Sequence, residues 1–391
     1  MVMKPKRVTI LGASGSVGES TLQLIEAAEP GEFEVVALTA NVNAGALARA
    51  AIRVGAKLAV VADENRFSEL KEALAGTAIE AAAGPDALLA AASEPTDWVM
   101  SAIVGTAGLN PTLAAIRQGA TVALANKETL VCAGSLATDE VRAAGATLLP
   151  ADSEHNAIFQ VLETDHPETI DRLILTASGG PFRTATRERM KTVTPAEAVA
   201  HPNWDMGAKI SVDSATMMNK GLEIIEASFL FHQPSEKIEV LVHPESIIHS
   251  MVAYCDGSVL AQLGTPDMKT PIANTLAWPG RMPIDTPKLD LAAIASLTFE
   301  APDDNRFPSL ALARAALKTG NSAPPVLNAA NEVAVAAFLS ESIGFLDIAD
   351  IVAEVLEKHD PRPVPSIEEA IDIDAETRRI TEDVIRARRP A

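Results

Sequence analysis

The chain has 391 residues, a formal net charge of −20 and 48% hydrophobic residues. Its length exceeds the ~250–300 residues at which single cores stop growing, so we expect two or three domains, and its hydrophobic content excludes a disordered protein. The negative charge argues against general nucleic-acid binding, because phosphate backbones require basic faces, so any bound phosphate must be small and locally held.

The sequence also predicts a compartment. It contains no uninterrupted apolar stretch of ~20 residues, so we expect a soluble protein without a membrane span. The start, MVMKPKRVTILGASG, lacks the apolar core of a signal peptide. Only Cys132 and Cys255 occur, widely separated, which suits a reducing compartment and argues against a disulfide framework or a thiolate metal site. We therefore expect a cytoplasmic protein.

Residues 1–150 are predicted to form the first domain, of the α/β class. Short apolar runs alternate there with alanine-rich helical stretches, which is typical of parallel βαβ units. The expected strands are Arg7–Leu11, Glu34–Leu38, Leu58–Val61, Trp98–Ile103, Thr121–Leu124 and Thr147–Pro150. The expected helices between them include Glu19–Ala28, Ala44–Val54 and Thr112–Gly119.

After residue 150 the composition and the pattern of apolar residues change. Residues 151–280 combine polar clusters with β-type segments and predict an α+β domain built around a site. The predicted strands there are Leu173–Leu175, Ile238–Val242 and Ser258–Leu263. Residues 281–308 are rich in Pro and Asp and predict an extended linker, whereas the apolar spacing of residues 309–391 predicts a helical domain.

A glycine-rich turn follows the first predicted strand. Its letters, GASGSVG, begin at Gly12 and open directly into a predicted helix. Glycines let the backbone approach a pyrophosphate, and the N–H groups and dipole of the helix N-terminus favour its negative charge. The spacing differs from G-x-G-x-x-G, and a plain tight turn is the alternative, but the strand-turn-helix context favours dinucleotide binding.

The end of the second predicted strand bears on the choice between NAD and NADP. Asn41 and Asn43 stand where an NAD-selective site usually carries an acid for the ribose 2′-OH. The missing carboxylate removes a repulsion against a 2′-phosphate, and Asn side chains can donate to one, so NADP is favoured. Capping of the next helix is the alternative role of both residues, and the two roles are compatible.

A second cluster follows the predicted strand Thr121–Leu124. Asn126, Lys127 and Glu128 lie at a strand's carboxyl end, where open α/β sheets bind ligands. Taken without that position, Lys127 and Glu128 would be a solvated ion pair.

Two acidic segments together predict a divalent-metal site. Asp152 and Glu154 follow the strand Thr147–Pro150, and an extended backbone there would project both carboxylates to one side. Hard oxygen ligands without Cys or clustered His suit Mg²⁺ or Mn²⁺ rather than zinc, and Glu223 can supply a third oxygen. His155 is either a ligand or a packed neighbour.

The run His201–Glu226 carries too few aliphatic residues for an ordinary core element. Its second half predicts a helix capped by one of the polar residues Ser211, Asp213 and Ser214, with apolar positions at Met217, Met218, Leu222, Ile224 and Ile225. On that helix Asn219 and Glu223 share a face, with Lys220 beside them. An exposed, salt-bridged face is the alternative for these charges.

Several groups able to hold a small phosphate occur in the same region. Ser178 precedes two glycines, and Ser214, Asn219 and Lys220 add further donors. Trp204 is either apolar cover that closes over a ligand or a core residue.

With these residues assembled, the chain resembles the 1-deoxy-D-xylulose 5-phosphate reductoisomerase family from end to end. The resemblance is carried by GASGSVG, ALANKETLV, LLPADSEHNAIFQ, TASGGPFR, HPNWDMGAKISVDSATMMNKGLE, VLVHPESIIHSMV, GSVLAQLGTPDM and LNAANEVAVAAFL. It implies an N-terminal Rossmann-like NADP-binding domain, a central catalytic domain and a C-terminal helical bundle in a homodimer.

The resemblance also implies roles for individual residues. It makes metal ligands of Asp152, Glu154 and Glu223 and gives catalytic roles to Lys127, Glu154 and His201. The substrate contacts that it implies are Lys127, Ser153, Glu154, Ser178, His201, Ser214, Asn219, Lys220 and Glu223. The cofactor contacts are Ser14, Gly15, Ser16, Val17, Asn41, Asn43, Asn126, Glu128 and Gly207. Trp204 and Met206 match a mobile flap, here about residues 178–208. Val42 stands where some members carry Lys, so NADP selectivity must rest on other groups.

The implied reaction converts 1-deoxy-D-xylulose 5-phosphate to 2-C-methyl-D-erythritol 4-phosphate in isoprenoid precursor biosynthesis. A skeletal rearrangement, either by retro-aldol and aldol steps or by direct migration, precedes hydride delivery from NADPH, and Mg²⁺ or Mn²⁺ acts as a Lewis acid. Two rival functions are a semialdehyde dehydrogenase with Cys132 as its nucleophile and a non-catalytic NADP-sensing protein.

Overall fold

The structure is a computed structural model that describes residues 4–201, 204 and 206–388. The chain divides into two compact units. The first comprises Met1–Thr129, Ala137–Asn156 and Asp267–Thr286, and the second comprises Leu130–Leu136, Ala157–Pro266 and Pro287–Ala391. The domain boundaries expected after residues 150, 280 and 308 remain predictions. None of the helices in the described part of the chain is both long and apolar enough to cross a bilayer.

The first unit is built on a parallel sheet of seven strands in the order β4-β3-β2-β1-β5-β6-β7. Its strands are β1 (Lys6–Leu11), β2 (Phe33–Ala40), β3 (Leu58–Val61), β4 (Glu80–Ala83), β5 (Trp98–Ser101), β6 (Thr121–Leu124) and β7 (Thr147–Pro150). The chain starts in the middle, moves outward to β4 and returns to β5, which pairs with β1. This reversal beside β1 is the point at which doubly wound sheets bind ligands.

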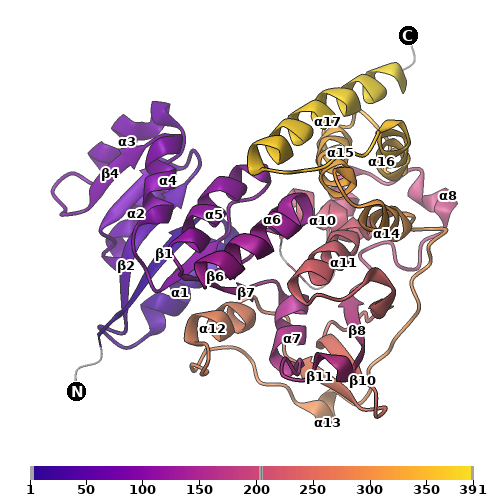
Figure 1. Ribbon diagram of the computed structural model, residues 1–391, viewed down its shortest axis with the longest axis horizontal. Helices are drawn as coiled ribbons and strands as arrows, with labels where there is room; N and C mark the ends of the chain where they lie inside the picture. Colours follow the sequence, from indigo (N-terminus) through magenta and orange to yellow (C-terminus); the bar gives the residue numbers. More distant parts are fainter. Residues whose placement is uncertain (1–3, 202–203, 205, 389–391) are drawn as a thin grey trace. The chain divides into compact units, whose positions relative to one another are not determined.

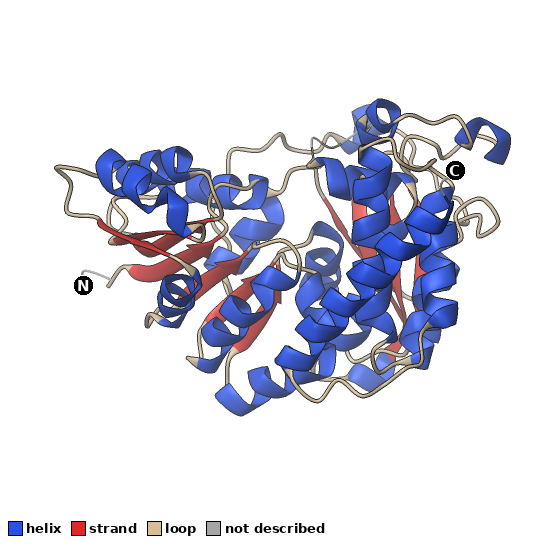
Figure 2. Cartoon of the chain, turned by 90° about the horizontal axis from the view of Figure 1, so that it is seen from above, coloured by secondary structure: helices blue, strands red, loops and turns tan. Residues whose placement is uncertain are grey.

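Helices cover both faces of this sheet, as Figure 2 shows with red strands between blue helices. The elements are α1 (Ser16–Ala27), α2 (Ala44–Val54), η1 (Glu64–Arg66), α3 (Phe67–Ala73), α4 (Pro85–Ser93), η2 (Thr106–Gly108), α5 (Leu109–Arg117), α6 (Glu128–Ala144) and α12 (Lys269–Ala277). Residues Leu130–Leu136 of α6 belong to the second unit. α12 comes from far along the sequence, yet its Ile272 and Leu276 lie in the same buried core as Ile10 of β1.

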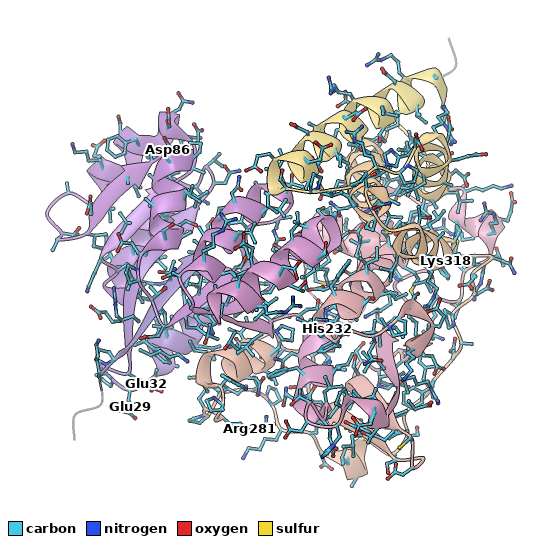
Figure 3. The ribbon with its side chains drawn as sticks, in the orientation of Figure 1. Glu29, Glu32, Asp86, His232, Arg281 and Lys318 are labelled. Carbon is cyan, nitrogen blue, oxygen red and sulfur yellow. The ribbon has the colours of Figure 1, made fainter. Side chains whose placement is uncertain are left out.

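The excess negative charge of the chain appears on the surface of this unit. Glu29 and Glu32 in the loop between α1 and β2, and Asp86 of α4, are exposed and point outward (Figure 3). Burial therefore distinguishes such surface carboxylates from those of a site.

The second unit contains a four-stranded sheet in the order β11-β10-β8-β9. Its strands are β8 (Ile170–Ala177), β9 (Ile238–Val242), β10 (Ile248–Tyr254) and β11 (Val259–Leu263). β8 pairs parallel with β9 and antiparallel with β10, and β10 pairs antiparallel with β11. All seven residues of β10 are buried, whereas β11 is an exposed edge strand.

The helices of the second unit precede, separate and follow its strands along the chain. Its elements are α7 (Ser153–Val161), whose first turn belongs to the first unit, η3 (Pro167–Thr169), α8 (Arg187–Met190), α9 (Pro195–Val199), α10 (Ala208–Ala215), α11 (Met218–Leu230), η4 (Ser235–Lys237), α13 (Leu291–Ile294), α14 (Ser309–Thr319), α15 (Ala323–Leu339), α16 (Asp347–Lys358) and α17 (Ile367–Arg388). Helix α15 packs against α16 and α17, which form the yellow end of the chain in Figure 1.

The predicted α/β class is confirmed, and all six predicted N-terminal strands are present. β4 was not predicted because its letters, EAAA, lack the β-branched and aromatic residues that favour strands. β10 was also not predicted, although its pairing on both sides makes it the central antiparallel strand of its sheet. Between residues 280 and 308 the described chain contains only the short helix α13 and an isolated bridge from Glu300 to Val242.

Candidate functional site

The glycine-rich turn lies between β1 and α1, as predicted. Gly12 adopts φ +92, and a Cβ on it would lie 2.6 Å from the carbonyl oxygen of Ala102. A Cβ on Gly18 would lie 2.4 Å from the Gly12 carbonyl oxygen, so the turn and the first helical turn are pressed together. Ser14, Gly15 and Ser16 are exposed, and Val17 is half-buried. No side chain caps α1, which leaves its N-terminal N–H groups available to an anion.

The capping role predicted after β2 is confirmed for Asn43, and that role leaves its amide nitrogen for a second one. Asn43 Oδ1 accepts a hydrogen bond of 3.0 Å from Ala46 N at the start of α2. Its amide nitrogen keeps two donor positions for another acceptor. Asn41 and Val42 are exposed beside it. Thr39, which the sequence analysis did not single out, accepts a 3.0 Å hydrogen bond from Gly12 N and so ties β2 to the glycine turn.

Asn126 organises the carboxyl end of β6. Its amide nitrogen donates to the carbonyl oxygens of Ile103 and Gly105, the latter at 3.0 Å, and its Oδ1 accepts 2.8 Å from Thr129 N. The side chain therefore shapes the loop and holds the first turn of α6. Glu128 in that turn is buried.

Lys127 is not a solvated partner of Glu128. Its Nζ donates to Asp152 Oδ2, and the two side chains are only 10% and 13% exposed. Burial of an ammonium group and a carboxylate requires this pairing, because an isolated charge would be costly away from water.

The local geometry at Asp152 and Glu154 differs from the expectation. The extended backbone predicted there is wrong, because α7 begins at Ser153 and Glu154 lies in its first turn. Asp152 Oδ1 accepts hydrogen bonds from Glu154 N at 3.1 Å and His155 N at 3.4 Å, as an N-terminal capping residue does. Ser153 Oγ donates to Glu154 Oε2 at 2.5 Å. His155 is fully buried, with Nδ1 3.4 Å from Asp152 Oδ1.

In the second unit, Ser178 and His201 meet directly. Trp204 N donates to His201 Nδ1 at 3.0 Å, so the proton of the neutral ring lies on Nε2. Nε2 is 2.8 Å from Ser178 Oγ and donates to it, as does Gly180 N at 3.2 Å. Both lone pairs of the Ser178 hydroxyl oxygen then accept hydrogen bonds. The proton of this hydroxyl is left to donate to a further acceptor, such as an anion.

The two glycines after Ser178 bring this turn onto the helix that carries Ser214. Gly179 and Gly180 have φ values of +82 and +65. A Cβ on Gly180 would lie 2.8 Å from the backbone oxygen of Ser214. The structure therefore brings together two of the predicted phosphate-binding segments, which are 36 residues apart in the sequence.

The predicted helix at the end of His201–Glu226 is two helices. α10 ends at Ala215, and Met217, with φ 63, precedes α11. The expected cap at Ser211, Asp213 or Ser214 is wrong, because all three lie within α10. The predicted apolar positions are confirmed as buried: Met217, Met218, Leu222, Ile224 and Ile225.

α11 presents Asn219, Lys220 and Glu223 together. Asn219 Nδ2 donates to Glu223 Oε1 at 2.5 Å, and Lys220 Nζ donates to Glu223 Oε2. Lys220 and Glu223 have side chains 4% and 0% exposed, so the exposed salt-bridged face is excluded.

The predicted flap is described in part. Residues 202, 203 and 205 lie outside the described residues. Trp204 and Met206 are half-buried, and the Trp204 ring centroid lies 6.3 Å from that of His249. Half-burial suits apolar cover better than a core residue. Gly207, a predicted cofactor contact, is exposed.

Comparisons with known proteins give one family along the chain. Family models described as 1-deoxy-D-xylulose 5-phosphate reductoisomerase, as its C-terminal domain and as DXP reductoisomerase C-terminal domain match residues 8–134, 148–231 and 263–380. A 1-deoxy-D-xylulose 5-phosphate reductoisomerase of Rhodospirillum centenum is 59% identical over 384 residues, which are 98% of this chain and 95% of the relative. One of Zymomonas mobilis is 59% identical over 375 residues, 96% of each chain.

Solved structures of the same enzyme are also similar. The Zymomonas mobilis reductoisomerase in complex with NADPH has a TM-score of 0.93 and 56% identity, covering 97% of this chain and 99% of the other. A DOX-P reductoisomerase in complex with NADPH, fosmidomycin and magnesium has a TM-score of 0.92 and 43% identity, covering 97% and 98%.

Proposed function

The chain belongs to the 1-deoxy-D-xylulose 5-phosphate reductoisomerase family, and from that premise we propose the reaction that it performs. It converts 1-deoxy-D-xylulose 5-phosphate to 2-C-methyl-D-erythritol 4-phosphate with NADPH and a divalent cation, in isoprenoid precursor biosynthesis. The observation that carries the proposal is a pair of buried lysine–carboxylate contacts, Lys127 with Asp152 and Lys220 with Glu223. Such groups suit a phosphorylated, oxygen-rich substrate bound with a metal.

The metal ligands in this proposal are Asp152, Glu154 and Glu223, a group whose carboxylates could hold a metal ion. Oxygen donors without thiolate or clustered imidazole fit Mg²⁺ or Mn²⁺. When bound, the cation supplies Lewis acidity toward adjacent carbonyl and hydroxyl oxygens of the substrate. Solved relatives are described in complex with magnesium, which supports this choice.

The phosphate of the substrate is assigned to Ser178, Ser214, Asn219 and Lys220. The outward-directed proton of Ser178 donates to a phosphate oxygen, and Lys220 contributes positive charge. Capture of this non-reacting group orients the rest of the sugar, so binding energy is spent on alignment for the rearrangement. Ser153, Glu154 and Glu223 are assigned to the sugar end.

Lys127 and His201 complete the proposed substrate contacts. The Lys127 ammonium group donates to a substrate oxygen and stabilises negative charge that develops on it during the rearrangement. His201, held as a neutral ring by Trp204 N, keeps the Ser178 hydroxyl oriented. The flap that carries His201 and Trp204 excludes water from the intermediate aldehyde until hydride arrives.

NADPH is assigned to the glycine turn of the first unit. Ser14, Gly15, Ser16 and Val17 line the uncapped start of α1, where a pyrophosphate gains the N–H donors. The side-chain amide nitrogens of Asn41 and Asn43 donate to the 2′-phosphate. These donors take the place of the Lys that some members carry at the position of Val42. The remaining cofactor contacts of the proposal are Asn126, Glu128 and Gly207.

The decisive experiment follows NADPH absorbance with purified protein and 1-deoxy-D-xylulose 5-phosphate. We expect oxidation that a chelator abolishes and that Mg²⁺ or Mn²⁺ restores. The same preparation should bind NADPH without the metal. Binding without any metal-dependent oxidation would overturn the proposal in favour of an NADP-sensing protein.

Cys132 tests the remaining rival. It is 3% exposed and lies within α6, a poor setting for a thiol nucleophile. Cys132→Ser is expected to leave turnover unchanged. Loss of turnover in a folded variant would favour a cysteine-dependent dehydrogenase.

We further propose a cytoplasmic homodimer. Cys132 and Cys255, the two cysteines of the sequence, are not joined in a disulfide, which suits a reducing compartment. Edge strand β11 exposes Val259 and Leu260 at 50% and 45%, an apolar edge that a second copy can cover.

We also propose residues 1–150 as the cofactor domain and 151–280 as the catalytic domain with its flap at about 178–208. The linker 281–308 then leads to the helical domain 309–391.

A further inference from the structure

Asp213 is a buried carboxylate on α10 that the proposed chemistry does not use. It is 1% exposed and precedes Ser214, which is assigned to the substrate phosphate. Its Oδ2 lies 2.8 Å from Lys209 Nζ on the same helix. Its Oδ1 accepts a 2.8 Å hydrogen bond from Asn331 Nδ2, a residue of α15 that lies 118 positions later.

The orientation of Asn331 follows from its partner. Reversing the amide would set its oxygen against the Asp213 carboxylate, so the nitrogen must face Asp213. Asn331 is fully buried, and its Oδ1 has no hydrogen-bond partner among the described residues. Burying an amide with an unmet acceptor costs free energy that an aliphatic side chain would avoid. The contact with Asp213 is therefore better explained as fixing the position of α10 relative to α15 than as general core packing.

Helix α10 is a shared support for the proposed phosphate groups. Its backbone at Ser214 is the surface on which Gly180 rests, so the turn that holds Ser178 depends on the position of α10. Met217 N donates to Ser214 O at 3.2 Å where the chain passes from α10 into α11, which carries Asn219 and Lys220. A shift of α10 would displace all of these groups together.

Helix α15 is in turn held by α17. Glu332, the neighbour of Asn331, accepts from Arg378 of α17, and Arg378 Nε donates to Asp374 Oδ2 at 2.6 Å. The buried hydrogen bond between Asn331 and Asp213 thus links α10 to a helix that packs against α16 and α17.

We propose that Asp213 is a positioning residue, which through Asn331 holds α10 where Ser214 and the Ser178 turn can grip the substrate phosphate. The inference rests on the proposed function, because it takes the phosphate assignment from it. Asp213 does not touch the substrate. Its removal should weaken phosphate binding more than it weakens NADPH binding.

The test compares Asp213→Asn, Asn331→Ala and the reciprocal double variant Asp213→Asn with Asn331→Asp. The free energy of a buried hydrogen bond to a charged group, expressed wholly in phosphate binding, is about a tenfold change in affinity. We expect KM for 1-deoxy-D-xylulose 5-phosphate and Kd for inorganic phosphate to rise by about that factor in both single variants. NADPH Kd should not change. The double variant restores a donor opposite a carboxylate and should return both constants to within about threefold of the parent.

Ser322→Ala is the matched control. Ser322 is also fully buried and immediately precedes α15, but the partners of its hydroxyl are His359 Nε2 at 2.7 Å and Arg362 N at 2.8 Å, which lie outside α10. Its loss should lower Tm and leave KM unchanged. The inference is overturned by unchanged KM and phosphate Kd in folded Asp213→Asn, by an equal rise in Ser322→Ala, or by a double variant no better than the single ones. If Asp213→Asn does not fold, Asn331→Ala with the double variant decides by the same criteria.

Phosphate Kd, measured by calorimetry, separates this inference from the proposed function. A parent protein that binds phosphate yet never oxidises NADPH would overturn the function alone. The variant series would still decide whether Asp213 positions the phosphate groups.

Discussion

At the scale of single residues, burial decides which charges belong to the site. Lys127 and Lys220 each contact a carboxylate within their own unit, and each pair is almost inaccessible to water. Buried ion pairs of this kind add little net stability compared with apolar residues of similar size. The presence of these two ion pairs is better explained by chemistry. A bound metal ion can replace each lysine as the partner of its carboxylate, and a phosphate can replace each carboxylate as the partner of its lysine.

Glu223 is the residue whose role is most sharply testable. Glu223→Gln keeps the shape and the contact with Lys220 but removes the charge that a divalent ion needs. We expect metal-dependent turnover to fall by at least about 100-fold, while NADPH Kd stays the same. Steady-state kinetics over a range of Mn²⁺ concentrations and a cofactor titration provide the measurement.

Glu354→Gln is the control for this variant. Glu354 lies in a surface network with Lys358 and Arg388, which lowers the pKa of its carboxyl group without placing it near the proposed site. Its substitution should leave turnover unchanged. Unchanged kinetics in Glu223→Gln would remove Glu223 from the proposed ligands.

At the scale of elements, the break between α10 and α11 shows where tertiary packing prevails. Nothing in the letters around Met217 favours a left-handed residue, yet Met217 has φ 63. Thr216 Oγ1 lies 3.1 Å from Val212 O and closes the end of α10. α11 then approaches α14 so closely that a Cβ on Gly221 would lie 2.8 Å from Ala313 Cβ. The helix that the apolar spacing predicted as continuous is divided so that both parts can pack.

The turn between β1 and α1 yields a prediction at the same scale. Gly18→Ala forces a methyl group to within 2.4 Å of the Gly12 oxygen and 2.6 Å of Ala13 Cα, and both of these neighbours are backbone atoms that cannot swing away. We expect a loss of about 1–3 kcal/mol in unfolding free energy and weaker NADPH binding. Urea unfolding and a fluorescence titration with NADPH measure the two effects.

Gly45→Ala serves as the control in the same unit. The atoms that its Cβ would meet belong to the side chains of Arg49, at 3.5 Å, and Glu69, at 3.8 Å, and alanine is the better helix former within α2. This variant should be as stable as the parent or more stable, with the same NADPH Kd. Equal behaviour of the two variants would contradict the close approach at Gly18.

At the scale of the whole molecule, acid stability depends in part on His359. Burial lowers the pKa of this imidazole, and Arg362 acts in the same direction. The unfolded chain then binds the proton more readily, so the stability contributed by the neutral ring is present above its ordinary pKa of 6.5 and is lost as pH falls below it. Tm measured between pH 7.5 and 5 should fall less in His359→Asn than in the parent. His166→Asn, which changes an exposed imidazole, should follow the parent curve.

The proposed homodimer is also tested at this scale. Leu260→Glu places a charge on the apolar edge of β11, where self-association would have to desolvate it. We expect sedimentation velocity to show a monomer for this variant and a dimer for the parent. Ile52→Glu alters a similarly exposed residue, 49% accessible, on α2 and should remain dimeric. A dimeric Leu260→Glu protein would exclude this edge as the interface.

The sequence by itself determined the family, the parallel α/β sheet and nearly all the residue types of the site. Strand periodicity, the glycine turn after β1 and the polar run from His201 are local patterns. Local patterns can be recognised in the amino-acid sequence without knowledge of the packing. The tertiary structure decided that Lys127 forms a buried ion pair with Asp152, that Glu154 lies in the first turn of a helix, and that Asp213 accepts a hydrogen bond from Asn331, 118 residues later. The physical reason is that burial and long-range pairing depend on which surfaces pack together, and a carboxylate in the sequence does not reveal whether water will reach it.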